Sequence, residues 1–443
     1  MAAALFLPLM AGAQAKTIKG RITDSRSKEP VAYAMLRVLD GSVGTQANLD
    51  GDYSIKLAAT EGRIAVSCIG YRSDTLSFRD LRKHPNIKLK PLEITLDAVS
   101  ISEFRKPSSL LKEVVRRIPD NYMCDTAVGT FFFRHYSLTE DSLWLFCEAM
   151  ADVMRPGYDK QYVQKMSLFS YDPDRIDSVK LAGNYKRYPL SRLLVYDTSM
   201  LRSMIGDSNY LQNPFVGRKQ TEYDDPTALT DLVQSASQLV SRRNARRFDK
   251  NSTLNLLDIG ERYYHINYVK DNDSISILIN QNDLALVHYY ISSRHTDTIT
   301  LPWPLNRILG GVIIPYRHQQ YDYAKINGRY TLVFNMWLKA SSIIPPKQAV
   351  LDNDIYRSFR NSITDHLVED YYVWTLVDMR RAEQGFLDAA IRTPHSKKIY
   401  YHEIFGHGDA SDDFWADYNT VPLEARIAGK LKAAMAGKKQ LND

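Results

Sequence analysis

The chain has 443 residues, of which 44% are apolar and 24% are charged. This balance excludes a wholly disordered, collagen-like or coiled-coil protein, and the length predicts two or three domains with separate cores. Lysine and arginine exceed aspartate and glutamate by 57 to 51, a formal charge of +6. The excess is spread along the chain, so we expect no nucleic-acid partner. The 28 tyrosines, against 15 phenylalanines, instead favour strands with one buried face and one wet face.

Residues 2–13 form a short apolar run, followed by the small-x-small pattern Ala13-Gln14-Ala15. The run is too short to span a bilayer, so it predicts a secretory signal peptide over residues 1–15. A buried N-terminal helix is the alternative interpretation. No later segment approaches 18 uninterrupted apolar residues, so we expect no transmembrane span. The expected location is the periplasm or the outer membrane of a cell envelope.

Three cysteines, Cys68, Cys124 and Cys147, are too few for a disulfide framework and are not spaced as zinc ligands. A bridge between Cys124 and Cys147 is feasible in an oxidising compartment. The alternative is a buried free thiol at Cys147, whose strand position points inward.

Residues 16–102 contain short alternating runs separated by turn signals, which predicts a β-sandwich. Asp50-Gly51 and Gly70 are predicted turn positions, where glycine can take positive φ. Asp50 and Asp52 are interpreted as a solvated hairpin rather than a calcium site.

This segment also carries five spaced motifs in a fixed order. They are Gly20-x-Ile22-x-Asp24, Pro30-Val31-x-x-Ala34, Gly44-Thr45, Asp50-Gly51-x-Tyr53-x-Ile55 and Val66-Ser67-x-Ile69-Gly70-Tyr71. Together they resemble the carboxypeptidase-regulatory-like domain, a prealbumin-like, seven-stranded sandwich common in exported Bacteroidetes-type proteins. The resemblance implies a non-catalytic accessory module.

Residues 103–443 predict an α+β domain. The segment Lys106-Pro107-Ser108-Ser109 opens a helix that either serine could cap, and Pro119-Asp120-Asn121 is expected to stop it. Asn327-Gly328 is the strongest hairpin signal in the chain. Further helices are expected near Thr227–Val240 and Leu423–Met435. The expected strands are Thr130–Leu138, Ser142–Met154, a pair within 161–183, Tyr263–Val269, Ser274–Ile279, Leu284–Ser292, Tyr316–Ile326, Arg329–Leu338 and Tyr371–Met379. Together they predict a mainly β protein with a curved antiparallel sheet or half-barrel after the sandwich.

A second set of motifs lies in this remainder. It comprises Ile118-Pro119-x-Asn121-Tyr122, Phe131-x-Phe133-Arg134-x-Tyr136, Glu148-Ala149, Ile277-x-Ile279, Ala285-Leu286-Val287 and Phe414-Trp415-x-x-Tyr418-Asn419. The set resembles the uncharacterised C-terminal part of Bacteroidetes-type proteins that contain a carboxypeptidase-like regulatory domain. It is similar, more weakly, to half-barrel lipoprotein carriers and lipoprotein-sorting proteins. The family name implies no peptidase.

Catalytic motifs receive little support. His402 and His407 are five residues apart with Gly406 between them, whereas a zinc helix needs two histidines four apart. His366 and Glu369 copy the zinc dyad of metallocarboxypeptidases, but chance pairing explains them as well.

Ser109-x-x-Lys112 copies a penicillin-binding nucleophile motif without that family's later motifs, and no Gly-x-Ser-x-Gly elbow is present. We therefore expect no catalytic residue, no metal site and no cofactor.

Two surface patterns are explained by local structure without a binding function. The cluster Arg242-Arg243-x-x-Arg246-Arg247 is interpreted as a solvated helix end rather than an anionic-lipid patch. Tyrosines are paired at 263–264, 289–290, 371–372 and 400–401. Since neighbours in a strand face opposite sides, one of each pair should be buried and the other should meet solvent.

The tripeptide Asp-Ser/Thr-aliphatic or Ala recurs more often than composition predicts. It resembles the O-glycosylation signal of exported Bacteroidetes-type proteins; the alternative is that it marks a strand that follows a turn. The candidate acceptors are Thr75, Thr126, Ser142, Ser178, Ser274 and Thr298.

The leading functional hypothesis is a non-catalytic cell-envelope protein that binds an envelope protein, a glycan or a lipid-like ligand. One alternative is an envelope hydrolase acting on peptides or glycans. Another is a lipid or lipoprotein carrier, which requires a large apolar concavity lined by residues 263–293 and 316–338.

Overall fold

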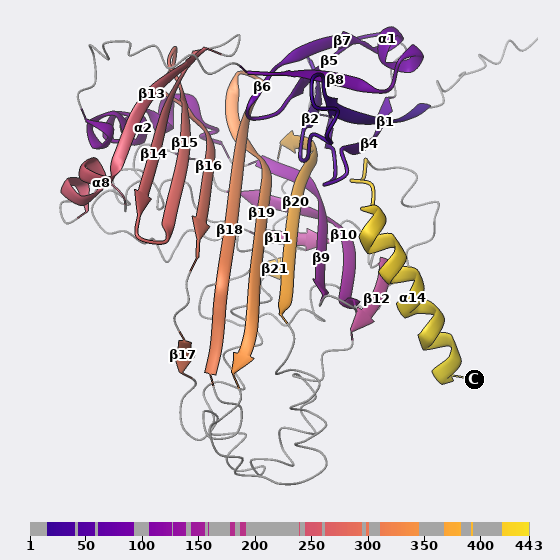
Figure 1. Cartoon of the computed structure of the whole chain (residues 1–443). Helices are drawn as coiled ribbons and strands as arrows, with labels where there is room; N and C mark the ends of the chain where they lie inside the picture. The colour runs from indigo at the N-terminus through magenta and orange to yellow at the C-terminus, as the bar shows by residue number, and fades with distance from the viewer. Residues whose placement is uncertain are drawn as a thin grey trace, which may run out of the picture.

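The structure is a computed structural model of the whole chain (Figure 1). It describes residues 16–39, 43–57, 61–92, 106–125, 127–138, 143–155, 158, 178–181, 187–191, 239, 244–258, 262–294, 298–300, 311–344, 367–381, 391–392 and 419–442. In this part of the chain no helix is both long enough and apolar enough to cross a membrane.

The N-terminal domain is the predicted sandwich, built from two four-stranded sheets. Its strands run in the orders β4-β1-β8-β6 and β3-β2-β5-β7. They are β1 (Lys16–Asp24), β2 (Met35–Val38), β3 (Gly44–Gln46), β4 (Asp52–Leu57), β5 (Arg63–Ser67), β6 (Tyr71–Arg72), β7 (Asp74–Ser77) and β8 (Ile87–Pro91), with helix α1 (Phe78–Lys83) before β8. There are eight strands rather than seven, because the two-residue β6 pairs with β8 in its own right.

Apolar side chains from both sheets fill the space between them. Ile22, Leu36, Ile55 and Ile64 are all fully buried in one cluster with Leu81 of α1. β4 alternates half-buried and buried positions, and β8 alternates buried positions with more exposed ones, as the sequence pattern predicts for sheets with one buried face.

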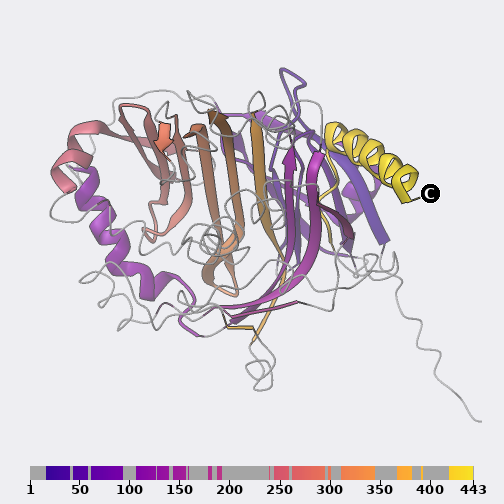
Figure 2. The same ribbon diagram turned by 90° about the horizontal axis from the view of Figure 1, so that it is seen from below.

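The remaining strands form one large antiparallel sheet of thirteen strands, in the order β13-β14-β15-β16-β18-β19-β20-β9-β10-β11-β21 with β12 beside β10 and β17 beside β18. The strands are β9 (Ala127–Leu138), β10 (Leu143–Arg155), β11 (Ser178–Leu181), β12 (Arg187–Ser191), β13 (Ser252–Asp258), β14 (Arg262–Lys270), β15 (Asp273–Asn280), β16 (Leu286–Ser293), β17 (Thr298–Thr300), β18 (Gly311–Ile326), β19 (Arg329–Ile344), β20 (Val368–Arg381) and β21 (Ile391–Arg392). Figure 2 shows the strands passing in an arc. The predicted curved sheet is confirmed, and it does not close into a barrel.

The predicted hairpins and meander are present, with strands that extend beyond the expected ends. Asn327 and Gly328 have φ of 52° and 79°, the two positive values that a tight turn between β18 and β19 requires. Residues 161–177 and most of Thr227–Val240 lie outside the described residues, so the elements predicted there stay predictions.

Helix α2 (Pro107–Asn121) covers what we call the inner face of the sheet. Its side chains Leu110, Leu111, Val114 and Ile118 are at most 1% exposed. They share one cluster with inner-face residues of five neighbouring strands: Ile266, Ile277, Tyr289, Tyr321, Tyr323 and Leu332. Within the described residues the part of this face beneath α2 is therefore a packed core.

The predicted stop of α2 is confirmed, but the expected serine cap was wrong. Lys106 precedes its first residue and Pro107 occupies the first turn, so neither serine caps it. Ser108 instead contacts α8 (Ala245–Asn251), because its amide and hydroxyl donate to the Asp249 carboxylate at 2.8 and 2.7 Å. Pro119 lies inside the last turn, and the helix ends at Asn121.

The opposite, outer face is covered in its right-hand half in Figure 1 by the sandwich and by α14 (Ala425–Asn442). Tyr136, Phe146 and Phe334 of this face pack with Ile427 and Leu431 of α14 in one buried cluster. The sandwich and α14 on this face explain why one pair of neighbouring tyrosines does not have one buried and one exposed member. Both Tyr371 and Tyr372 are buried, because β20 is covered on its two faces. The rule holds for 263–264 and 289–290, where one tyrosine is buried and the other half-buried.

Candidate functional site

The outer face of the sheet carries two polar arrangements, the first of which joins it to the sandwich. The Tyr371 hydroxyl donates to the Tyr33 hydroxyl at 2.7 Å. The Thr375 hydroxyl donates to the Gln46 side-chain oxygen at 3.2 Å. The Tyr33 ring also lies 5.7 Å from the ring of Phe334. We call these contacts, together with residues 419–425, the junction.

Residues 419–425 form a bridge between the two domains. Asn419 accepts from the Lys56 amide at 2.6 Å and donates to the Gly44 carbonyl at 3.4 Å. The Asp50 carboxylate accepts from the amide of Ala425, the first residue of α14, at 2.7 Å. The half-exposed turn at Asp50 is therefore also a contact between the sandwich and α14. A carboxylate at this place satisfies a helix N–H that has no partner within the helix.

Arg134 of β9 lies under this bridge and is almost fully buried. Its guanidinium donates to Glu148 of β10 at 2.8 and 2.6 Å, and to the carbonyls of Val421 and Pro422 at 2.6 and 3.1 Å. The Glu424 carboxylate lies 3.6 Å away. Burial by itself lowers the pKa of Arg134, but the two carboxylates raise it above its usual value. Burial raises the pKa of Glu424, and Arg134 opposes that shift.

The junction is a built interface with hydrogen bonds at buried polar groups on both sides. Buried polar groups are stable only when they are paired, so these contacts fix one relative position of the sandwich and the sheet.

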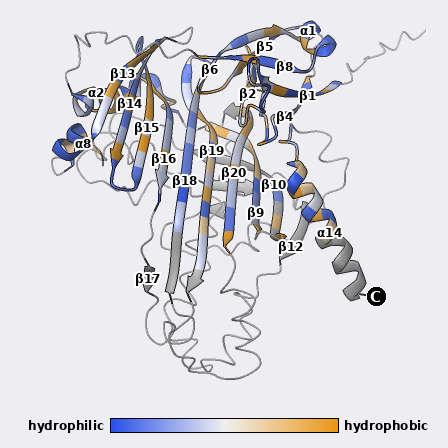
Figure 3. Ribbon diagram, viewed as in Figure 1, coloured by the Kyte–Doolittle hydropathy of each residue, from blue (hydrophilic) through white to orange (hydrophobic). Residues whose placement is uncertain are grey.

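The second arrangement lies beside the sandwich on the outer face, along β16 and β18. Figure 3 shows hydrophilic stretches along β18 here. Because directly paired residues of antiparallel strands share a face, the register places these side chains together. We call it the polar row: His288, Tyr290, Tyr316, His318, Gln320, Asp322 and Glu369.

Hydrogen bonds join the side chains of the polar row in three separate groups. His288 Nδ1 lies 2.5 Å from an Asp322 oxygen, and the Tyr290 hydroxyl lies 2.9 Å from His318 Nδ1. The Tyr316 hydroxyl donates to Glu369 of β20. One carboxylate therefore stands near each end of the row.

Four rings of the polar row lie at similar spacing. The ring centroids of His288 and Tyr290 are 6.5 Å apart with planes 9° from parallel, and those of Tyr290 and His318 are 6.0 Å apart at 11°. Tyr316 follows His318 at 5.6 Å and 35°. Tyr290, Tyr316 and His318 are half-buried, so part of each ring meets solvent.

Two imidazoles, His318 in the row and His265 beside it, favour the neutral form. Burial lowers the pKa of His318, and nearby Arg294 lowers it further. Burial also lowers the pKa of His265, a neighbour on β14, with a contribution from His288. Cys68 of the sandwich lies near Asp322, and burial together with that carboxylate raises the pKa of its thiol to about 12. The thiol is therefore protonated and a poor nucleophile at neutral pH.

The same face contains two parts of a hydrolytic triad, but they belong to different imidazoles. His265 Nε2 lies 2.9 Å from the Ser276 hydroxyl, while the Asp322 carboxylate holds His288. A triad needs the carboxylate and the serine on one imidazole. The arrangement offers ring faces and hydrogen-bonding groups rather than an activated nucleophile.

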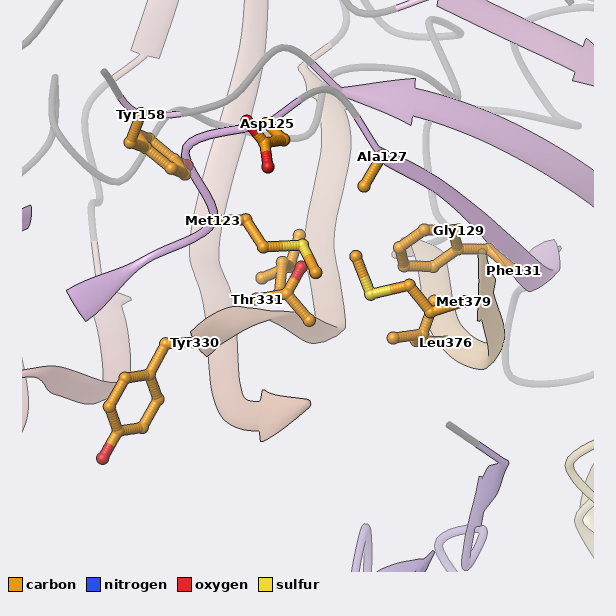
Figure 4. Close-up of a pocket in the computed structure, with 11 residues that line it drawn as sticks. Met123, Asp125, Ala127, Gly129, Phe131, Tyr158, Tyr330, Thr331, Leu376 and Met379 are labelled. Atoms are coloured by element: carbon orange, nitrogen blue, oxygen red, sulfur yellow. The ribbon is translucent and has the colours of Figure 1, made fainter. Parts of the chain in front are cut away.

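A small pocket lies on the inner side, between the end of α2 and strands β9, β19 and β20. Figure 4 shows the Met123 and Met379 side chains pointing into it, with Asp125 and Phe131 at its wall. Its cavity volume is about 30 Å³, room for one or two water molecules. Sites for small organic ligands are roughly ten times larger or more.

The other candidates from the sequence are scattered. Glu369 lies on β20, where it accepts from Tyr316, while His366, His402 and His407 lie outside the described residues. No cluster of three or more metal-ligating side chains occurs in the described ranges. Ser109 and Lys112 lie in α2.

Two further predictions concern the surface and the cysteines. Arg246 and Arg247 are exposed on α8, as a solvated helix end requires; Arg242 and Arg243 lie outside the described residues. Cys124 is a free thiol, so the bridge to Cys147 is not formed.

The glycosylation candidates stay predictions. Thr75 is exposed on β7 and Ser274 is half-buried on β15. Ser178 and Thr298 begin strands, whereas Thr126 and Ser142 lie outside the described residues. An intact mass of the native protein without hexose-sized increments would contradict the prediction.

Comparison with known proteins bears on the sandwich. Residues 18–101 match the family described as the CarboxypepD_reg-like domain. The N-terminal domain is a carboxypeptidase-regulatory-like domain. No curated protein matches the chain. The large sheet, which carries the polar row and half of the junction with the carboxypeptidase-regulatory-like domain, lies outside that match.

The polar row was missed at the level of sequence, although its signal is readable. Alternate residues in β16 are His288, Tyr290 and Ser292, and alternate residues in β18 begin at Tyr316 and end at Asp322. Taken alone, the pattern of each strand shows only that one of its faces is polar. The ladder between the strands is what joins the two patterns into a row.

Proposed function

We propose that this protein is an exported, non-catalytic binding protein of the cell envelope, in which the carboxypeptidase-regulatory-like domain is a fixed accessory to the large sheet. The observation that carries the proposal is the partly exposed polar row beside a domain held in place by the buried junction. Such a pairing provides a preorganised surface at little cost in conformational entropy.

Two features weigh against the alternatives. A lipid carrier would need the inner face open, but its part beneath α2 is packed with α2 side chains within the described residues. The Ser276–His265 and His288–Asp322 pairs do not share an imidazole, which gives no support to hydrolysis at this place.

The test is a binding screen of the purified full chain against envelope proteins, peptidoglycan, polysaccharides and lipid vesicles. Saturable binding to any of these, without turnover of the ligand, supports the proposal. No binding to any of them, or hydrolysis of a bound ligand, contradicts it. Hydrolysis that is unchanged after exchange of His366, Glu369, His402 and His407 would in addition exclude a metal-dependent hydrolase at these residues.

A further inference from the structure

The polar row is a composite of ring faces and hydrogen-bonding groups with a direction along the strands. From Tyr316 to Asp322 it covers six residue steps of β18, or about 20 Å at the usual strand rise. Its rings repeat at 5.6 to 6.5 Å. A ligand that matches it must be elongated and must present apolar patches and polar groups in alternation.

The position of the row in the sheet excludes recognition by strand addition. β16 pairs with β15 and β18, and β18 pairs with β16 and β19, so the backbone groups of both strands are already used. An extended peptide normally gains its affinity from such backbone groups at a sheet edge. The ligand of this row must instead be recognised by side chains alone.

The charges of the row select against other ligand classes. The row itself contains two carboxylates, Asp322 and Glu369, and Arg294 near His318 is a neighbouring cation, so the row disfavours a polyanion at both of its ends. An acyl chain would lie on imidazoles, phenol hydroxyls and carboxylates, which it cannot hydrogen-bond. A neutral polyol is not repelled by the carboxylates and can pair with the polar groups. Sugar rings have C–H faces that stack on aromatic rings, and their hydroxyls hydrogen-bond to carboxylates and imidazoles.

We propose that the polar row binds an uncharged oligosaccharide lying along β16 and β18. Tyr290 and Tyr316 supply the stacking faces, while Asp322, Gln320 and His318 bond the sugar hydroxyls. This inference rests on the proposed binding function and assigns its ligand class and site.

The test is electrophoresis of the full chain in native gels that contain soluble starch, galactomannan, xyloglucan, mixed-linkage β-glucan or dextran. We expect retardation by at least one of them. Exchange of both tyrosines to threonine, which preserves strand propensity, should weaken that binding about tenfold or more. Tyr263→Thr, a half-buried tyrosine outside the row, should bind like the wild type.

Two further measurements keep the outcome decisive. Tyr316→Phe retains the ring but loses the bond to Glu369, and it should bind within about threefold of the wild type, whether or not the double variant folds. Because the ligand is uncharged, retardation should hardly change when the salt concentration is raised. Strong salt dependence overturns the inference.

The possible failures are distinguishable. If none of the neutral polysaccharides retards the protein but a protein or lipid ligand binds in the screen, the inference is wrong and the proposed function stands. Equal loss in Tyr263→Thr and in the double variant also overturns the inference.

Discussion

Asp50, in a turn of the sandwich, accepts a hydrogen bond at 2.7 Å from the backbone amide of Ala425, the first residue of the C-terminal helix. The two residues are 375 positions apart in the chain. The contact supplies the helix with a capping carboxylate from another domain, so it links the stability of α14 to the position of the sandwich.

Loss of this cap should destabilise the junction modestly. We expect Asp50→Ala to lower the free energy of unfolding by about 1 kcal/mol, as for other N-cap acceptors, and Asp50→Asn to retain most of it because an amide oxygen also accepts. Urea unfolding monitored by fluorescence measures the change. Exchange of exposed Glu61 to alanine is the control, and an equal loss there would contradict the prediction.

Removing the buried cation should cost far more. We expect Arg134→Met to lower the free energy of unfolding by about 3–5 kcal/mol, because the buried carboxylates of Glu148 and Glu424 would lose the guanidinium that compensates their charge. Arg116→Met is the matched control. It breaks an exposed pair with Glu113, 68% of the arginine side chain being exposed, and should cost less than about 1 kcal/mol.

A double exchange tests the reason for that loss. Arg134→Met combined with Glu148→Leu removes one of the two carboxylates that Arg134 compensates. The double variant should therefore recover part of the stability lost in the single variant. If the double variant is less stable than Arg134→Met, the loss comes from packing rather than from an unpaired charge.

His135 should make stability fall in mild acid. Burial lowers its pKa to about 3 in the native protein, whereas the unfolded chain binds a proton near the ordinary value of about 6.5. Its contribution is therefore fully present above about pH 6.5 and is lost as the pH falls toward 3. Between about pH 7.5 and pH 5 the wild type should lose about 2 kcal/mol from this residue.

The variant His135→Phe isolates that contribution, since a ring can still stack on Tyr372, whose centroid lies 3.9 Å away. Urea unfolding at the two pH values should show a smaller decrease for this variant than for the wild type. Exchange of exposed His84 to phenylalanine should leave the wild-type pH dependence unchanged. Equal pH dependence of His135→Phe and the wild type would rule out this origin.

Sequence patterns predicted the elements better than their mutual arrangement. Alternation over residues 263–293 and the turn at Asn327-Gly328 gave the meander and the hairpin, because these depend on neighbours in the chain. The spaced motifs of residues 16–102 likewise indicated the sandwich. The cap of α2 was assigned wrongly because Ser108, a good cap residue by type, contacts Asp249 instead, a partner 141 positions away.

The junction and the polar row could not be predicted for the same reason. Asp50 belongs to a turn that local rules place in solvent, and Tyr371-Tyr372 is an ordinary half-wet strand pair until another domain covers it. Likewise, nothing in the separate sequences of β16 and β18 shows that His288 meets Asp322. These features depend on contacts between distant segments, which one sequence does not encode by spacing.

Two glycines in turns of the sandwich have similar backbone conformations but different surroundings. Exchanging each for alanine therefore distinguishes the effect of steric crowding from that of backbone strain. Gly51 and Gly70 have similar φ, +76° and +82°. A Cβ at Gly51 would lie 2.4 Å from the Ile22 carbonyl oxygen, whereas one at Gly70 would meet nothing within 4 Å. Gly70→Ala should therefore cost only the left-handed backbone, about 1–2 kcal/mol.

Gly51→Ala must bear that cost and also displace β1, because Ile22 is hydrogen-bonded to Gly51 through its amide at 2.8 Å. We expect it to lower the free energy of unfolding by about 3 kcal/mol or more. Thermal or urea unfolding of the two variants side by side measures the difference. Equal losses would mean that the turn at Gly51 relaxes away from β1. In that case Asp50, its neighbour, would also move relative to Ala425, and the cap on α14 would be weakened in the same variant.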